Sequence, residues 1–166
     1  MAKITFKGNP VNTRGALPAV GEQAPDFSLV KADLSEAKLS DFKGKNVILN
    51  IFPSLDTGVC AASVRRFNEE VTKKNNTVVL GISADLPFAA GRFCSAEGIE
   101  NVISLSNFRD TEFGEKYGLL MVDGPLKGLL ARSVVVVNPE GKIIYEELVP
   151  EIAQEPDYNS AINSIV

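Results

Sequence analysis

The chain has 166 residues, of which 45% are hydrophobic and 23% charged, and its formal net charge is −4. This length and balance predict one globular domain over residues 1–166, with a core that buries roughly 70% of the unfolded surface. The negative charge disfavours nucleic acid and anionic membranes as partners. No apolar run approaches the roughly 20 residues that span a bilayer, and residues 1–8 lack the apolar stretch of a signal peptide, so we expect a cytoplasmic protein.

Histidine is absent, and cysteine occurs only at Cys60 and Cys94. Without histidine, the Ser–His and Cys–His nucleophile pairs of many hydrolases are impossible, and two thiols alone make a poor zinc site. The sequence also lacks the glycine-rich loops that cradle nucleotide phosphates. We therefore expect neither a metal nor a cofactor.

The first half of the chain begins with short strand patterns. Residues 3–7 and 11–14 flank a Gly-Asn-Pro turn and predict a hairpin, and 27–30 predicts a further strand. Residues 38–45 have the composition of a loop with one helical turn. Residues 47–52 are apolar or neutral throughout, which is typical of a strand buried on both faces.

After Cys60, the apolar residues Val64, Phe67 and Val71 recur at helical spacing, and the charged residues lie between them. This pattern predicts a helix with Cys60 in its first turn, on the inward edge. Further on we expect strands at 77–83, 102–105, 133–137 and 142–146, and helices at 87–96, 111–117 and 157–165. The order of these elements predicts an α/β fold with a mixed central sheet, helices on both faces and an N-terminal β-hairpin.

Cys60 follows a buried strand and a loop, and it opens a helix. Free N–H groups and the helix dipole at such a position favour the thiolate, which is the reactive form of cysteine. Because no histidine is present to act as a base, this arrangement indicates redox chemistry and not acyl transfer. A fast thiol enzyme must also stabilise charge in the transition state, which requires a fixed cation or hydrogen-bond donors near the sulfur.

Two residues are candidates for that role. Thr57 lies about one helical turn before Cys60, so its hydroxyl can reach the region of the sulfur. Arg132 opens the 133–137 strand, and a guanidinium offers a permanent charge and a planar fork of donors. Pro53 lacks an N–H group and stiffens the entrance of the loop. Spacing alone leaves several rival cations, namely Arg14, Arg65, Arg66, Arg92 and Arg109.

The pattern Pro53-x-x-x-Thr57-x-x-Cys60 resembles the peroxidatic-cysteine motif of the peroxiredoxins. The longer run from residue 50 to 65 is similar to one branch, the bacterial thiol peroxidases, which are atypical two-cysteine enzymes. The later runs at 83–89, 92–94, 123–129 and 155–158 fit the same branch. This resemblance implies a thioredoxin-like fold with an N-terminal hairpin, usually as a homodimer. It also implies reduction of hydrogen peroxide or alkyl hydroperoxides, with thioredoxin as the reductant.

The same resemblance implies a role for each matching residue. Cys60 corresponds to the peroxidatic thiol and Cys94 to the resolving thiol, which condense to an intramolecular disulfide. Thr57 corresponds to the residue that hydrogen-bonds the peroxide, Pro53 to the one that shields the pocket, and Arg132 to the one that holds thiolate and peroxide. Because a disulfide requires Cα atoms about 5.5–6 Å apart, we expect one of the two cysteine helices to unwind locally on oxidation.

Each of these residues also has a purely structural interpretation. Cys60 and Cys94 are of a type often buried in cores, Thr57 fits a helix cap, Arg132 fits a surface ion pair, and Pro53 fits a strand terminator. Two other functions are also open. A protein dithiol–disulfide oxidoreductase usually carries Cys-x-x-Cys, but Thr57 occupies the first of those positions here. In a redox sensor or binding module, oxidation of the thiols switches a partner surface.

Overall fold

The computed structural model describes residues 2–165. Its strands are β1 (Lys3–Phe6), β2 (Asn9–Arg14), β3 (Ser28–Lys31), β4 (Glu36–Lys38), β5 (Asn46–Ile51), β6 (Thr77–Ser83), β7 (Val102–Ser106), β8 (Leu120–Met121), β9 (Ser133–Val137) and β10 (Ile143–Leu148). Its α-helices are α1 (Gly58–Glu70), α2 (Pro87–Glu97), α3 (Phe113–Lys116) and α4 (Tyr158–Asn163). Short 3-10 helices are η1 (Leu39–Phe42) and η2 (Val71–Lys73).

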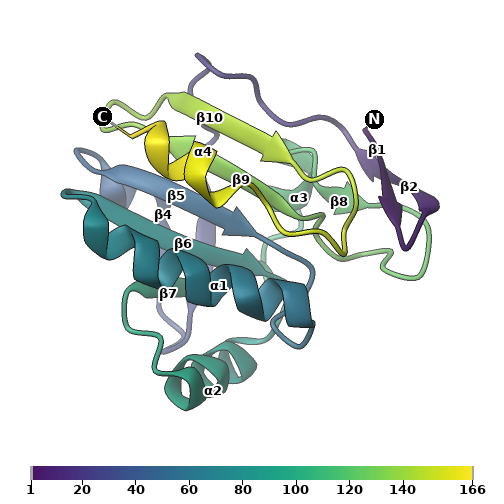
Figure 1. The fold of residues 1–166 in the computed structure, drawn as a ribbon, viewed down its shortest axis with the longest axis horizontal. Helices are drawn as coiled ribbons and strands as arrows, with labels where there is room; N and C mark the ends of the chain where they lie inside the picture. The colour runs from purple at the N-terminus through teal and green to yellow at the C-terminus, as the bar shows by residue number, and fades with distance from the viewer. Residues whose placement is uncertain (1, 166) are drawn as a thin grey trace.

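The main sheet has the strand order β10-β9-β5-β6-β7-β3-β4 (Figure 1). Strands β5, β6 and β7 run parallel, whereas β9 pairs antiparallel with β5 and β3 antiparallel with β7. The predicted mixed sheet is therefore confirmed. Strand β5 lies inside the sheet between β9 and β6, which explains why its residues from Val47 to Ile51 are all buried and why its sequence does not alternate.

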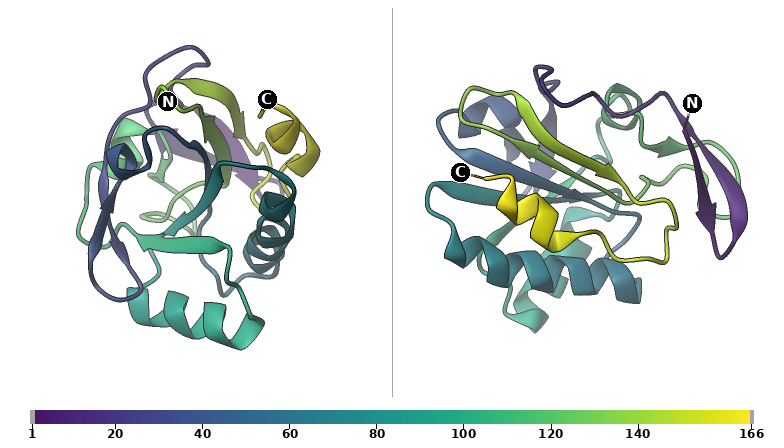
Figure 2. Two further views of the ribbon diagram at one scale, coloured as in Figure 1. Left: turned by 90° about the vertical axis from the view of Figure 1, so that its left-hand side faces the viewer. Right: turned by 45° about the horizontal axis from the view of Figure 1, so that its top comes forward.

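Helices cover both faces of this sheet, as predicted (Figure 2). On one face, Ile48 of β5 and Phe52, which directly follows β5, pack against residues of α1, α2 and α4. The other face packs Val47, Leu49 and Ile51 against α3 and η1. Alternate side chains of a strand point to opposite faces, so one apolar strand supplies both layers of the core.

The predicted N-terminal hairpin is present, but it belongs to a second sheet. Strand β2 pairs with β1 on one side and with β8 on the other (Figure 1). Strands β4 and β8 were not predicted, since strands of two or three residues are too short to show a period. The helical turn expected within 38–45 is confirmed as η1, although β4 extends to Lys38, and the helix expected at 111–117 is shorter, since α3 spans only Phe113–Lys116.

The topology brings several loops together where the parallel strands end. Phe52 N–H donates to the carbonyl of Ile82, and Asn107 N–H donates to the carbonyl of Ser83. The segments that follow β5, β6 and β7 therefore lie side by side at one edge of the sheet, where α/β proteins commonly place their sites. Within residues 2–165, no helix is long and apolar enough to cross a membrane.

Candidate active site

Cys60 lies in the first turn of α1, as predicted, and none of its surface is exposed. It packs in the cluster that contains Phe52, Leu55 and Val64. The first hydrogen bond of the helix runs from Ala61 N–H to the carbonyl of Thr57. The N–H groups of residues 58–60 donate to no acceptor in the described part of the chain. The sulfur thus belongs to a helix turn whose backbone donors are free to bind an anion or a polarised oxygen.

Arg132 is the cation that the fold places at this sulfur. It directly precedes β9, and because Ile51 pairs with Ser133, the guanidinium emerges on the face covered by α1. Its Nη2 donates to Cys60 Sγ at 3.1 Å, and its Nε donates to the carbonyl oxygen of Ile152 at 2.8 Å. Only 1% of Arg132 is exposed, so the alternative of a surface ion pair is wrong.

One nitrogen of this guanidinium is left without a bond. Nη1 of Arg132 is buried and has no hydrogen-bond partner among residues 2–165. A buried, unpaired donor carries an unfavourable free energy of roughly 1–3 kcal/mol, and more when the group is charged. Such a donor next to a thiol is typical of a site that binds an oxygen atom during the reaction.

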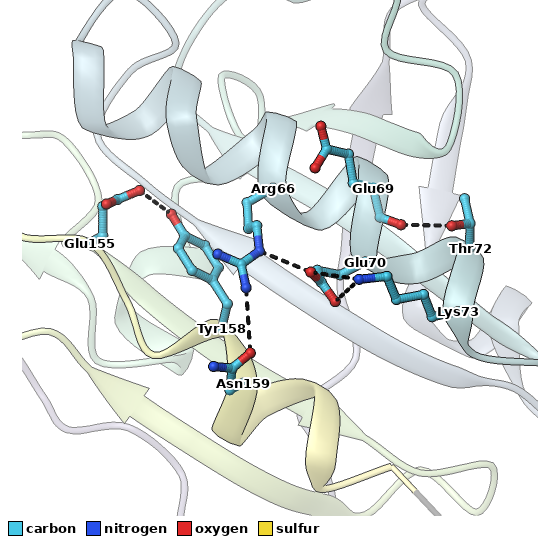
Figure 3. Close-up of polar contacts among 8 residues, drawn as sticks. All are labelled: Arg66, Glu69, Glu70, Thr72, Lys73, Glu155, Tyr158 and Asn159. Carbon is cyan, nitrogen blue, oxygen red and sulfur yellow. Dashed lines mark hydrogen bonds and ion pairs between the residues drawn. The ribbon is translucent and has the colours of Figure 1, made fainter.

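The rival arginines are engaged elsewhere or exposed. Figure 3 shows Arg66 of α1 stacked on the ring of Tyr158 in α4 and bonded to Glu70 and Asn159. Its guanidinium carbon lies 4.9 Å from the centre of that ring. Arg66 therefore fastens α1 to α4 and does not contact the thiol. Three other rivals form exposed ion pairs: Arg14 with Glu115, Arg65 with Glu97, and Arg109 with Glu36. Arg92 is exposed and forms no ion pair with the described residues.

The loop before α1 contains the other two predicted site residues. Pro53 is buried, whereas Thr57 is exposed at the N-cap position of α1. The Thr57 hydroxyl donates to the carbonyl of Ser54 at 3.1 Å. It makes neither a capping bond nor a hydrogen bond to Cys60, so the cap interpretation is wrong for its side chain. Its hydroxyl oxygen is exposed and keeps its capacity to accept a hydrogen bond.

A carboxylate that the sequence analysis missed holds this loop. Asp85 follows β6, and its oxygens accept hydrogen bonds of 2.7 Å from the Ser54 hydroxyl, the Leu55 N–H and the Ser83 hydroxyl. The available signal was an acidic residue just past the carboxyl end of a buried parallel strand. Spacing gave no indication that this residue would face the loop of Cys60.

A second missed contact lies beneath α1. Asn50 is a polar residue inside the apolar β5 strand, and it is 1% exposed. Its Nδ2 donates to the Ser63 hydroxyl at 3.2 Å, and that hydroxyl donates to the carbonyl of Cys60 at 2.8 Å. A polar residue in an otherwise apolar strand was the signal that could have found it.

Cys94 lies on α2 and is partly buried. Its sulfur is 3.2 Å from the hydroxyl oxygen of Ser104 on β7. Both cysteines are free thiols, and they belong to different helices on the same face of the sheet. Residues 2–165 contain no group of three or more His, Cys, Asp or Glu side chains that could hold a metal ion.

The fold and this site define a class of protein. The scaffold is thioredoxin-like, and it places a buried thiol at a helix N-terminus beside a buried arginine on a mixed sheet. The model of the Redoxin family matches residues 19–162. Relatives described as thiol peroxidase are 56% identical in Corynebacterium glutamicum and 55% identical in Mycobacterium tuberculosis, and each comparison covers 99% of both chains.

Solved structures agree with this result. A peroxiredoxin-like protein from Aquifex aeolicus has a TM-score of 0.93 at 41% identity, over 98% of this chain and 95% of that one. A thiol peroxidase from Chromobacterium violaceum has a TM-score of 0.89 at 20% identity, over 95% and 91%, and supports the fold. The chain belongs to the Redoxin family, and within that family it is a thiol peroxidase. The resemblance found in the sequence and the thioredoxin-like fold are therefore confirmed.

Proposed function

We propose that this thiol peroxidase reduces hydrogen peroxide and alkyl hydroperoxides with Cys60 as the peroxidatic residue. The observation that carries the proposal is the 3.1 Å contact between Arg132 Nη2 and the buried sulfur of Cys60. A fixed cation at this distance donates a charge-assisted hydrogen bond to the sulfur, and no histidine is involved. It also remains in place during the reaction, because the carbonyl of Ile152 holds Nε.

In the first step the thiolate attacks one oxygen of the hydroperoxide. An S–O bond forms and the O–O bond breaks, so the sulfur becomes a sulfenic acid, and the leaving hydroxide or alkoxide takes up a proton to become water or alcohol. Negative charge develops on the leaving oxygen. The free Nη1 of Arg132 and the free N–H groups of residues 58–60 are the donors that stabilise it. Thr57 orients the peroxide, and Pro53 keeps water from the sulfur.

In the second step the thiol of Cys94 attacks the sulfenic sulfur, and a disulfide forms with loss of water. Because the two thiols belong to separate helices, α1 or α2 must unwind locally to bring the Cα atoms within about 6 Å. Thioredoxin then reduces the disulfide by thiol exchange. A homodimer is what the family resemblance implies, and the lack of a signal-peptide pattern in the sequence is why we expect it in the cytoplasm.

The test is peroxide-dependent turnover with thioredoxin and thioredoxin reductase, measured for wild type, Cys60→Ser and Cys94→Ser. We expect repeated turnover for wild type and none for Cys60→Ser. We expect Cys94→Ser to form a sulfenic acid once and not to recycle. A wild-type protein that forms one disulfide and is not reduced by thioredoxin would instead be a redox sensor. Reduction of protein disulfides without peroxide would make it a dithiol oxidoreductase.

A further inference from the structure

We infer that Asp85 is a positioning residue of the thiol site, which clamps the loop before α1 to the end of β6. The inference rests on the proposed role of Cys60. Asp85 is partly buried, and its two carboxylate oxygens accept three hydrogen bonds of 2.7 Å. Two of the donors, Ser54 and Leu55, belong to the loop, and they lie 31 and 30 positions away in the chain. The third, Ser83, is the last residue of β6.

The clamp reaches Thr57 through Ser54. The Ser54 hydroxyl donates to Asp85. The Ser54 carbonyl accepts two hydrogen bonds from Thr57, one from the Thr57 hydroxyl at 3.1 Å and one from the Thr57 N–H at 3.3 Å. Thr57 is also the N-cap residue of α1, so its position sets where the first turn of that helix begins. The chain of contacts therefore runs from β6 through Asp85 and Ser54 to the turn that carries Cys60.

The negative charge of this carboxylate strengthens the clamp. All three partners of Asp85 donate to it, and a carboxylate has acceptor sites for all of them. In Asp85→Asn, an NH₂ group in place of the oxygen that binds Ser54 donates to the Ser54 hydroxyl oxygen, but the Ser54 O–H then has no acceptor on residue 85 and every bond loses its charge assistance. The loop is then held less firmly. A displacement of about 1 Å in a positioned group can slow a reaction by roughly a hundredfold.

The experiment compares two reactions of the same thiol in the full chain. The first is oxidation of Cys60 by hydrogen peroxide, followed by rapid quenching and trapping of the sulfenic acid. The second is alkylation by iodoacetamide, which needs the thiolate but no oriented hydroxyl or leaving-oxygen site. For Asp85→Asn we expect the peroxide rate constant to fall by about ten- to a hundredfold and the alkylation rate to change less than about threefold. A merely structural defect would expose the buried thiol and speed alkylation.

Asp123→Asn is the matched control. Asp123 also joins two distant segments, since it accepts the N–H of Asn12 at 2.8 Å and the side-chain amide of Asn12 at 2.7 Å, but it has no hydrogen bond to the 53–57 loop. Its removal should leave the ratio of the two rate constants unchanged. If Asp85→Asn folds poorly, Ser54→Ala removes one arm of the clamp, and we expect a smaller fall of about three- to tenfold.

A double-mutant cycle decides whether these residues act as one unit. Adding Ser54→Ala to Asp85→Asn should lower the peroxide rate no further, because the charge-assisted bond between them is already lost. The inference is overturned if Asp85→Asn reacts with peroxide within about threefold of wild type, or if the two effects add in full. A wild-type protein whose Cys60 does not react with peroxide would refute the proposed function itself, which is a different result.

Discussion

Replacing Arg132 tests whether a buried guanidinium, and not the helix terminus alone, activates the thiol. Arg132→Met keeps the length and apolar volume of the side chain, but it removes the bond to Cys60 Sγ at 3.1 Å and the free Nη1 donor. A hydrogen bond to a charged group contributes about 1.5–3 kcal/mol. At 1.36 kcal/mol per factor of ten, the rate constant with hydrogen peroxide should fall by roughly 10- to 150-fold.

The same substitution should have little effect on stability. A buried cation with an unpaired nitrogen is costly to desolvate, and apolar side chains of similar size often replace buried charges without loss. We expect the free energy of unfolding of Arg132→Met to stay within about 2 kcal/mol of wild type. Arg132→Lys keeps the charge, but an ammonium cannot bond both the Ile152 carbonyl and the sulfur in the same fixed fork, so it too should lose about tenfold in rate.

The assay is stopped-flow or quenched-flow oxidation of the reduced protein over a range of peroxide concentrations, together with denaturant unfolding. Arg66→Met is the control, because Arg66 packs on Tyr158 (Figure 3) and has no hydrogen bond to the thiol. It should react within about twofold of wild type, since a half-exposed ion pair contributes little. If Arg132→Met also reacted within threefold of wild type, the electrostatic account of this site would be refuted.

Three further predictions concern the loop, the tyrosines and one glycine. Thr57→Val keeps the shape of the side chain but loses the hydroxyl, so the rate constant with peroxide should fall by about tenfold or more. Thr57→Ser keeps the hydroxyl and should retain most of the rate. Equal rates for both variants would exclude a role for the hydroxyl. Burial raises the pKa of all three tyrosines, to about 12 for Tyr145, where the charges of neighbouring carboxylates add to the effect. The folded state keeps phenol protons that unfolded tyrosines lose near pH 10. The free energy of unfolding should therefore be unaffected by the tyrosines below pH 10 and should decline from there towards pH 12. An ultraviolet titration that shows a native tyrosine ionising near pH 10 would contradict this. Gly118 has a φ of +66°, and a Cβ there would overlap the backbone of Ala16. Gly118→Ala should therefore lower the free energy of unfolding by about 3 kcal/mol or more, measured by denaturant unfolding. An unchanged denaturation midpoint would show that this contact relaxes freely.

The local features of this protein could be predicted from its amino-acid sequence. The apolar run at 47–52 and the helical spacing from Cys60 to Val71 predicted β5 and α1, because burial and periodicity are properties of neighbouring residues. The motif that ends in Cys60 identified the class of enzyme, since its residues lie within one loop and one helix turn. That residues 1–166 form one domain stays a prediction.

Which distant residues meet at the thiol depends on the three-dimensional packing of the chain. Arg132 and Cys60 are 72 positions apart. The family resemblance implied Arg132, but spacing left five rival arginines until the pairing of β9 with β5 placed Arg132 under α1. The bond from Asp85 to Ser54 and the pairing of β8 with β2 depended in the same way on strand order and on loops that meet at one edge. Register and strand order are set by the packing of the whole core, so no local pattern in the chain records them.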